Sequence, residues 1–244
     1  MLTLPIITFI RSFYLTSLKK GGTHSIKPLN HRLHDLKTEL KSSGQSNFDY
    51  ASKEGWEIFY SESHKFNAEE YEWHSSVSNN DIIKSVPNVA KSCLIVGCGS
   101  SRLPYELYHS AQHEQLEITC LDYSEICVAQ LEERYTNLDS RIRILRGDAT
   151  KLDDYFGMNE YDVIIDKGLV DVFMCGDGWD SDLEKLFNGA CHVLCAEGRY
   201  ILVSYKLANH TKRFLSDVSR SFQWQFDLSE NSSSSVSFSV AVKN

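Results

Sequence analysis

The sequence of 244 residues predicts an α/β fold, a doubly wound and mostly parallel seven-stranded sheet that closes with a C-terminal antiparallel hairpin. Three observations support this prediction. Short apolar segments alternate with helical ones, a pattern typical of parallel sheets. A glycine-rich turn follows the first apolar strand. Near the C-terminus, Phe222–Leu228 and Ser235–Val242 alternate apolar and polar residues around a serine-rich turn, which indicates the antiparallel pair.

The segment Ser92–Leu103, S-C-L-I-V-G-C-G-S-S-R-L, organises the prediction. Its four apolar residues predict a strand buried on both faces. Gly97-Cys98-Gly99 then turns the chain, and Ser100 or Ser101 can cap the helix that follows. A strand, a glycine-rich turn and a helix N-terminus form a cofactor cradle in such sheets. The dinucleotide fingerprint needs a third glycine where Arg102 stands, so a nucleoside cofactor without phosphates is favoured.

The other elements follow from the spacing of apolar residues. The predicted strands are Leu116–Leu121, Arg141–Leu145, Tyr161–Ile165 and Arg199–Tyr205. The predicted helices are Asp81–Val86, Leu103–Gln112, Glu125–Tyr135, Ser181–Cys195 and one around Phe214–Val218. We expect Gly198 to end the helix before the last parallel strand. Ligands of such sheets bind outside the carboxyl ends of the strands, beside the first strand.

Aspartates follow three of the later strands at the point where each strand ends. Asp122 comes 23 residues after Gly99, where a carboxylate can accept hydrogen bonds from both ribose hydroxyls. Tyr123 can stack on adenine, and Asp148-Ala149 can meet the adenine amino edge. Asp166 ends the fourth strand. A single aspartate is most often a cap or turn residue, but together they predict a nucleoside site.

An aromatic segment, Phe48–His74, precedes the first strand. Trp56, Phe59 and Tyr60 stand at i, i+3 and i+4, on one face of a predicted helix. This helix either packs over the sheet as ordinary core or acts as a lid whose rings close a cofactor pocket. Its aromatic residues are Phe48, Tyr50, Trp56, Phe59, Tyr60, Phe66, Tyr71 and Trp73.

Composition excludes several classes of protein. The net charge of −8 argues against wholesale nucleic-acid binding and suits a basic partner, and no apolar run reaches the ~18 residues that a membrane span needs. The seven cysteines form no C-x-x-C pair and lie mostly in apolar segments, so we expect reduced core residues of an intracellular protein. His109 and His113 have no third ligand nearby, and we expect no metal site.

The first residues differ in composition from the rest. Met1–Asn30 lacks acidic residues, is rich in Ser and Thr and carries scattered positive charge. This composition fits a mitochondrial transit peptide or, equally, a disordered tail, so the expected location is mitochondrial or cytoplasmic. His31–Leu40 has helical spacing. We therefore divide the chain into a tail, residues 1–45, and one domain, residues 46–244, whose aromatic lid spans residues 48–75.

These motifs resemble the class I, seven-strand S-adenosylmethionine-dependent methyltransferases, whose fold is Rossmann-like. The likeness runs from about Phe48 to Asn244 and rests on I-V-G-C-G-S-S, L-D-Y-S, G-D-A-T and I-I-D-K-G. The segments G-W-E-I-F-Y, Y-E-W-H and I-I-D-K-G-L-V-D are also similar to protein-lysine methyltransferases of translation elongation factor 1 alpha or mitochondrial citrate synthase. Four positions depart from that group: Gly55, His74, Leu169 and Val172.

The resemblance implies S-adenosylmethionine as cofactor and a lysine-bearing protein as substrate. The residues expected to bind the cofactor are Trp56, Tyr60, Trp73, Gly97, Cys98, Gly99, Asp122, Tyr123, Asp148 and Ala149. The expected catalytic residues are Asp166, which would position the cofactor amino group or the incoming amine, and Lys167, which would pair with Asp171 or hold the loop. His64 and His74 are candidate bases that no motif ties to a nucleophile.

Other functions remain open at this point. A small-molecule methyltransferase would share the cradle and differ only in its acceptor pocket. A catalytically silent domain that serves as a scaffold would share the fold. Arg102 and the terminal hairpin disfavour an NAD-dependent oxidoreductase, and the sequence holds no P-loop, G-x-S-x-G or H-E-x-x-H.

Overall fold

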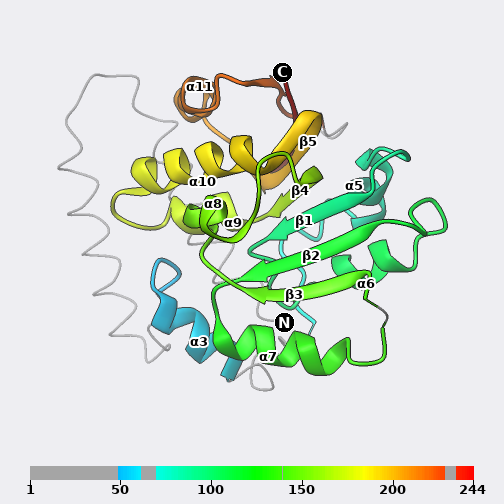
Figure 1. Ribbon diagram of the computed structural model, residues 1–244. Helices are drawn as coiled ribbons and strands as arrows, with labels where there is room; N and C mark the ends of the chain where they lie inside the picture. Colours follow the sequence, from blue (N-terminus) through cyan, green and yellow to red (C-terminus); the bar gives the residue numbers. More distant parts are fainter. Residues whose placement is uncertain (1–48, 62–69, 139, 229–234) are drawn as a thin grey trace. The chain divides into compact units, whose positions relative to one another are not determined.

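A seven-stranded sheet in the order β3-β2-β1-β4-β5-β7-β6 forms the centre of the computed structural model, which describes residues 49–61, 70–138, 140–228 and 235–244 (Figure 1). β1 to β5 are parallel, whereas β7 is antiparallel to both β5 and β6. The predicted fold class is therefore confirmed. The strands are β1 (Ser92–Val96), β2 (Glu117–Asp122), β3 (Ile142–Arg146), β4 (Tyr161–Lys167), β5 (Leu194–Tyr205), β6 (Phe222–Gln225) and β7 (Val236–Lys243).

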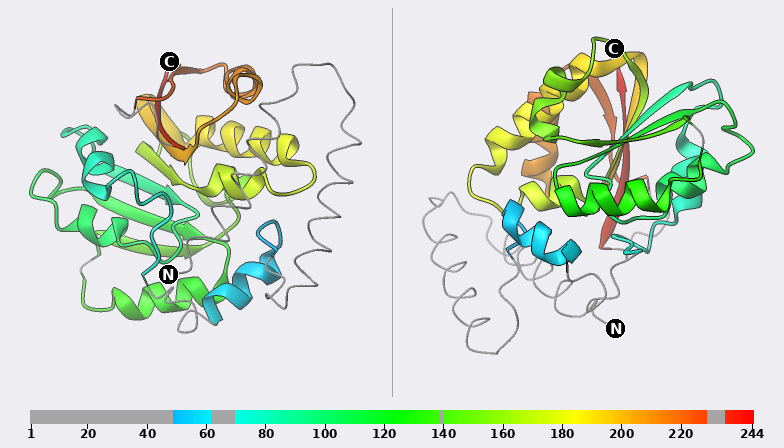
Figure 2. Two further views of the ribbon diagram at one scale, coloured as in Figure 1. Left: turned by 180° about the vertical axis from the view of Figure 1, so that it is seen from behind. Right: turned by 60° about the horizontal axis from the view of Figure 1, so that its bottom comes forward.

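Helices cover both faces of the sheet, with α10 and α11 on one side and α5 and α6 on the other (Figure 2). The α-helices are α3 (Lys53–Ser61), α5 (Asn79–Ser85), α6 (Leu103–Tyr108), α7 (Glu125–Arg134), α8 (Leu152–Tyr155), α9 (Leu169–Phe173), α10 (Trp179–Val193) and α11 (Asn209–Val218). A 3₁₀ turn, η1 (Ala149–Lys151), precedes α8. The tail at residues 1–45, the helix at His31–Leu40 and His64 lie outside the described residues.

Burial on both faces explains why β1 is apolar throughout. Leu94 and Val96 face the core cluster that α10 completes with Leu186 and Phe187. Because side chains alternate along a strand, Cys93 and Ile95 point to the opposite face, where they are also buried. Full burial of each large apolar side chain contributes about 1.5–3 kcal/mol, so two covered faces strongly stabilise a five-residue strand.

Gly198 does not end α10, contrary to the prediction. The helix ends at Val193, and the chain passes directly into β5 at Leu194, whose backbone is extended. Gly198 lies inside β5, where a Cβ atom would stand 2.4 Å from Leu194 Cδ2 and 2.8 Å from the Cys195 carbonyl oxygen. Close approach of the chain to itself, and not helix termination, therefore requires glycine there.

Local capping fixes where other helices begin. Ser124 Oγ accepts from the Cys127 amide at the start of α7, as a cap should. At α6 the prediction of a cap by Ser100 or Ser101 is wrong, because the N-cap residue is Arg102 and its side chain makes no capping bond. The Ser101 hydroxyl still accepts from the Leu103 amide at 3.1 Å. α6 is also shorter than predicted, because it ends at Tyr108 and not at Gln112.

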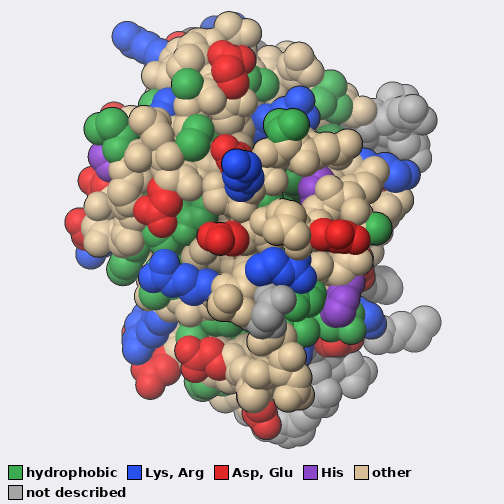
Figure 3. Space-filling view, turned by 45° about the vertical axis from the view of Figure 1, so that its right-hand side comes forward, with side chains coloured by type: hydrophobic (Ala, Val, Ile, Leu, Met, Phe, Trp, Pro, Cys, Tyr) green, Lys and Arg blue, Asp and Glu red, His purple; other side chains and the backbone are tan. Residues whose placement is uncertain are grey.

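The surface carries charges of both signs (Figure 3), and the cysteines, all of which the structure describes, form no disulfides. Acidic and basic side chains are interspersed on the face drawn in Figure 3. Within the described ranges, no helix has both the length and the apolar character to cross a bilayer. All seven cysteines are free thiols. Four are buried as predicted, whereas Cys175, Cys191 and Cys195 are partly exposed.

Candidate active site

The carboxyl ends of β1, β2 and β3 are joined by hydrogen bonds. The Cys98 amide donates to the Leu121 carbonyl at 3.1 Å, and the Gly99 amide donates to Asp122 Oδ2 at 2.9 Å. The Gly147 amide donates to the Asp122 carbonyl at 2.9 Å. The glycine-rich turn, Asp122 and the loop that carries Asp148 therefore form one continuous surface at the switch point of the sheet.

Backbone conformation and lack of space both explain why this turn contains glycine. Gly97 and Gly99 have φ values of +57° and +55°, in the left-handed region that favours glycine. A Cβ atom at Gly97 would lie 3.0 Å from Leu169 Cδ1, and one at Gly99 would lie 3.0 Å from Tyr60 Oη. The missing side chains thus let Leu169 and the aromatic helix approach the turn closely.

Asp122 is a buried carboxylate held at the centre of this surface. Its side chain accepts from the Gly99 amide at 2.9 Å and from the Ser124 amide at 3.0 Å. Burial raises the pKa of Asp122 to about 6, although these amide donors oppose the shift. These backbone amides, with that of Tyr123, fix the orientation of the carboxylate.

Two of the three residues expected near adenine, Asp148 and Tyr123, also have structural partners. Asp148 Oδ1 accepts from the Thr150 amide at 2.9 Å and from the Thr150 hydroxyl at 2.7 Å, so it caps η1 as a turn residue does. Ala149 beside it is buried. The Tyr123 hydroxyl donates to the Ser52 carbonyl at 3.3 Å and ties β2 to the start of α3.

The aromatic helix α3 is anchored over the site by polar contacts. Trp56, Phe59 and Tyr60 are buried. Glu57, on the same helix, accepts from the Ser124 hydroxyl at 2.7 Å and from the Glu125 amide at 2.8 Å. A carboxylate at a helix N-terminus is stabilised by the free amides there, and these donors lower the pKa of Glu57 although its partial burial opposes the change.

The three aromatic residues expected to wall the site lie together. The rings of Trp56 and Tyr60 are 6.0 Å apart, and those of Trp56 and Trp73 are 5.8 Å apart. Tyr60 also reaches the glycine-rich turn. The buried rings of the helix pack as core and Tyr60 lies beside the glycine-rich turn. Whether they also close a cofactor pocket stays a prediction.

A second anchor runs through the strap, as we call Glu70–Asn79. Glu72 accepts from the Ser101 hydroxyl at 3.0 Å and from the Arg102 amide at 2.6 Å. The same carboxylate pairs with Lys167 Nζ, which also donates to Asn79 Oδ1 at 2.7 Å. One side chain of the strap therefore holds the β1 loop and the end of β4 together.

The position of Lys167 corrects one expectation. Its ammonium group pairs with Glu72, and not with Asp171 as one of the two predicted alternatives required. Asp171 instead contacts His74 Nε2 at 2.7 Å. The Lys167 side chain is 6% exposed, and its ion pair with Glu72 holds the loop after β4 against the strap.

Asp166 is fully buried beneath the start of α9. Its Oδ1 accepts from the Leu169 amide at 2.9 Å, and its Oδ2 accepts from the Tyr200 hydroxyl at 2.9 Å. Burial raises the pKa of Asp166 to about 7, with the nearby Asp171 adding to the shift. The side chain thus fixes Gly168 and α9 relative to β5.

Changing Glu72 to Gln is expected to lower the free energy of unfolding by about 3 kcal/mol, because it leaves the buried Lys167 ammonium without a counter-charge. Urea unfolding at pH 7 measures the loss. Glu125→Gln, in the exposed pair with Arg146, is the matched control and should cost less than about 1 kcal/mol. If the two variants lost equal free energy of unfolding, the ion pair of Glu72 with Lys167 would not stabilise the fold more than an exposed pair does.

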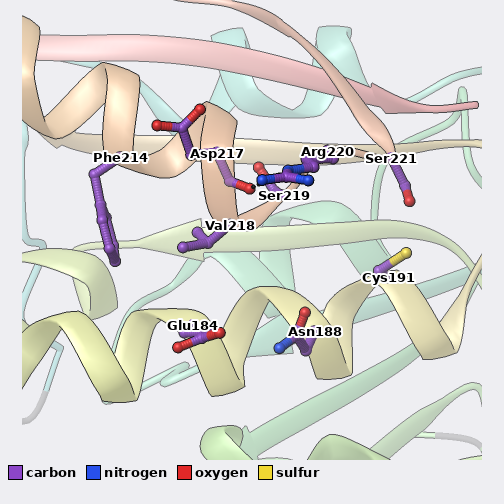
Figure 4. A pocket seen from close by; sticks show the side chains of 9 residues that line it. All are labelled: Glu184, Asn188, Cys191, Phe214, Asp217, Val218, Ser219, Arg220 and Ser221. Carbon is purple, nitrogen blue, oxygen red and sulfur yellow. Dashed lines mark hydrogen bonds between the residues drawn. The ribbon is translucent and has the colours of Figure 1, made fainter.

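One pocket of the structure lies outside this site. It has a volume of about 560 Å³ and lies between α10 and the end of α11, where its lining includes Glu184, Cys191 and Arg220 (Figure 4). None of its lining residues is among the predicted site residues. Within the described part of the chain, no three His, Cys, Asp or Glu side chains gather as metal ligands would.

The strand order and the glycine-rich turn contacting an acid on β2 define a Rossmann-like methyltransferase fold. A family model described as a methyltransferase domain matches residues 88–235, and the chain belongs to this family. The solved TehB-like SAM-dependent methyltransferase of Corynebacterium glutamicum shares the fold, with a TM-score of 0.52 and 14% identity over 89% of this chain and 100% of that chain. A phosphoethanolamine N-methyltransferase of Haemonchus contortus, solved with S-adenosylhomocysteine, has a TM-score of 0.51 and 15% identity over 68% of this chain and 52% of that chain.

Two curated relatives are similar in sequence. The bovine eEF1A lysine and N-terminal methyltransferase is 25% identical over 179 residues, which cover 72% of this chain and 24% of the relative. The mouse EEF1A lysine methyltransferase 4 is 26% identical over 166 residues, which cover 64% of this chain and 62% of the relative. The match thus spans about a quarter of the bovine protein and under two thirds of the mouse protein.

Sequence reasoning missed two residues that shape the site. Glu57 and Tyr200 each contact a predicted site residue or the loop that carries it. Glu72 and Leu169, which the resemblance had singled out without a structural role, do the same. Glu72 had a signal, because it precedes Trp73 in the segment Y-E-W-H. Apart from Asn79, seven residues on, its partners lie 29 or more residues away. No local pattern indicates such a pairing.

Proposed function

We propose that this methyltransferase uses S-adenosylmethionine and methylates a lysine amine of a protein. The contact of Gly99 with Asp122 carries the cofactor assignment. An adenosine ligand needs a carboxylate for its ribose hydroxyls and a backbone turn that approaches closely, and these two features adjoin here. Tyr123 follows Asp122 and Ala149 follows Asp148, and we assign these two residues to an adenine ring. When bound, the cofactor supplies an activated methyl group.

The aromatic residues favour an amine acceptor. A lysine attacks only as the neutral amine, and its ordinary pKa is about 10.4. Desolvation among aromatic rings lowers that pKa, and the same rings attract ammonium groups through cation–π interactions. Tyr50, Tyr71 and Trp73 supply such rings, with centroids 5.2 Å apart for Tyr71 and Trp73 and 6.2 Å apart for Tyr50 and Trp73.

The names of the relatives indicate the first acceptor to test, a lysine of translation elongation factor eEF1A. The strap Glu70–Asn79 carries Trp73 and, through Glu72, contacts both the loop after β1 and the end of β4. The aromatic rings that we assign to the acceptor are therefore connected to the loops that we assign to the cofactor. Departures from the lysine methyltransferase pattern at His74 and Leu169 stand next to Gly168 and Gly97, and these two side chains would set which acceptor is taken.

Labelling with tritiated methyl groups tests the proposal. The full chain is incubated with methyl-labelled S-adenosylmethionine and either purified eEF1A or a whole-cell protein extract, and labelled peptides are mapped by mass spectrometry. We expect a lysine to carry the label, and calorimetry to show binding of S-adenosylmethionine but not of NAD. Label on small molecules alone would replace the lysine assignment with a small-molecule acceptor. Binding without any transfer would favour a scaffold.

A further inference from the structure

A buried imidazole–carboxylate pair lies beside the end of β4. His74 Nε2 is 2.7 Å from Asp171 Oδ2, and the two side chains are only 2% and 5% exposed. Asp171 stands in the first turn of α9, just after Asp166 and Gly168. A Cβ atom at Gly168 would lie 3.7 Å from His74 Nε2, so the imidazole packs directly against the strand end that carries the expected catalytic residues.

The contacts of Asp171 fix which nitrogen of His74 carries a proton. Both oxygens of Asp171 accept from the Tyr205 amide, at 3.1 and 3.2 Å, so this carboxylate is held as an acceptor. Nε2 of His74 must therefore donate to it, and in the neutral ring Nδ1 keeps the lone pair. No hydrogen bond to Nδ1 is found among the described residues.

The surroundings of the pair suit an ammonium substrate. The Tyr205 ring packs edge-on against His74 with centroids 4.7 Å apart, and Trp73 is its chain neighbour. The titratable groups near the pair include Asp166 on β4, Tyr205 on β5 with Tyr71 and Cys175 close to it, and Lys167, whose charge Glu72 neutralises. The ring positions and the carboxylate of Asp171 favour a cation near His74.

We propose that His74, oriented by Asp171, accepts the proton of the substrate lysine, an inference that rests on the proposed function. One N–H bond of the ammonium group breaks, the proton passes to His74 Nδ1, and the electron pair stays on the lysine nitrogen as the nucleophile. Asp171 stabilises the imidazolium that forms. Solvent removes the proton after each turnover. A carboxylate-oriented imidazole is a common general base in enzymes.

The same pair could simply fasten the strap to α9, and three variants separate these roles. Gln at position 74 can still donate to Asp171 but cannot take a proton, so His74→Gln preserves a fastening contact and removes a base. Phe at position 74 restores the aromatic residue that the lysine methyltransferases carry. Asp171→Asn keeps the shape of the carboxylate and removes its charge. His113→Gln, at another buried histidine that contacts Ile83, is the matched control.

The experiment measures kcat between pH 6 and 10 with the lysine acceptor found by labelling. General-base catalysis contributes about 10²- to 10⁴-fold, so His74→Gln and His74→Phe should lose at least about 100-fold at pH 7 and recover about tenfold per pH unit above it. Asp171→Asn should lose less. The dissociation constant for S-adenosylmethionine should not change in these variants, and His113→Gln should match the wild type.

A second readout does not depend on turnover. Nitrogen-15 spectra of histidine side chains in the full chain should show His74 in the Nε2–H form, with a lone pair on Nδ1. Wild-type kcat and pH profile in His74→Gln would overturn the inference while leaving lysine methylation intact, and so would an Nδ1–H tautomer. A wild-type chain that labels no protein lysine would overturn the proposed function and this inference together.

Discussion

Replacing Asp122 with Ala is expected to weaken the binding of S-adenosylmethionine by at least about 100-fold. The substitution removes a buried carboxylate that we place against two ribose hydroxyls, and hydrogen bonds to charged groups contribute about 1.5–3 kcal/mol each. It also frees the Gly99 amide, so the glycine-rich turn loses a contact of 2.9 Å. Titration calorimetry measures the change. An unaltered affinity would contradict the assignment of Asp122.

A matched control separates binding from stability. Asp162 accepts from the Lys91 and Ser92 amides at 2.7 and 3.1 Å, so it also holds the backbone of β1, but at the amino end of the strand. Asp162→Ala should therefore lower the free energy of unfolding without changing cofactor affinity. Loss of affinity in both variants would indicate general damage to the sheet.

The pH dependence of binding follows from the raised pKa of Asp122, which is about 6. The carboxylate accepts hydrogen bonds best when ionised, so affinity should be full above pH 7 and fall by up to about tenfold per unit below pH 6. Asp122→Asn cannot ionise and should bind weakly without this slope. The affinity at pH 5, 6 and 7 provides the comparison.

Replacing Asp166 has the second large expected effect, and it acts on turnover. Asp166→Ala removes the acceptor of the Leu169 amide and the Tyr200 hydroxyl, so the start of α9 loses its fixed position. Because α9 carries Asp171 and borders Gly97 through Leu169, kcat should fall by about 100-fold or more. The affinity for S-adenosylmethionine should change little. Equal losses in affinity and turnover would contradict this division.

Asp166→Asn gives a test by stability. Burial raises the folded-state pKa of Asp166 to about 7, above its unfolded value near 3.9, so the folded chain holds this proton more tightly. In the wild type, the contribution of Asp166 to the free energy of unfolding is therefore complete below about pH 4. It falls by up to about 1.4 kcal/mol per pH unit as the pH rises to 7. The Asn variant lacks this slope and should be the more stable chain at pH 8. Urea unfolding at pH 5 and 8 measures it.

The fold was predictable because the central parallel strands β1 and β4 are covered on both faces. Apolar runs such as Cys93–Val96 exist only where helices exclude water on two sides, so their order along the chain implies the layers. The aspartates at the strand ends were predictable for a related reason. Parallel strands end at one edge, and Asp122 comes directly after an apolar run.

The ties between loops were not predictable. Glu57 and Ser124 are 67 residues apart, and Glu72 and Lys167 are 95 residues apart. Such pairs depend on how loops lie in three dimensions, which neither periodicity nor capping encodes. The short helix α9 was also missed, because five residues after a left-handed Gly168 carry too little periodic signal.

The Glu72 contact also bears on where the working enzyme begins. The family model starts at residue 88, yet the carboxylate that neutralises Lys167 and receives the Arg102 amide stands 16 residues before it. The residues that the family model matches therefore do not include the side chain that ties the glycine-rich loop to the end of β4. A chain shortened to begin at residue 88 would lack this tie and would leave the Lys167 ammonium group without its counter-charge.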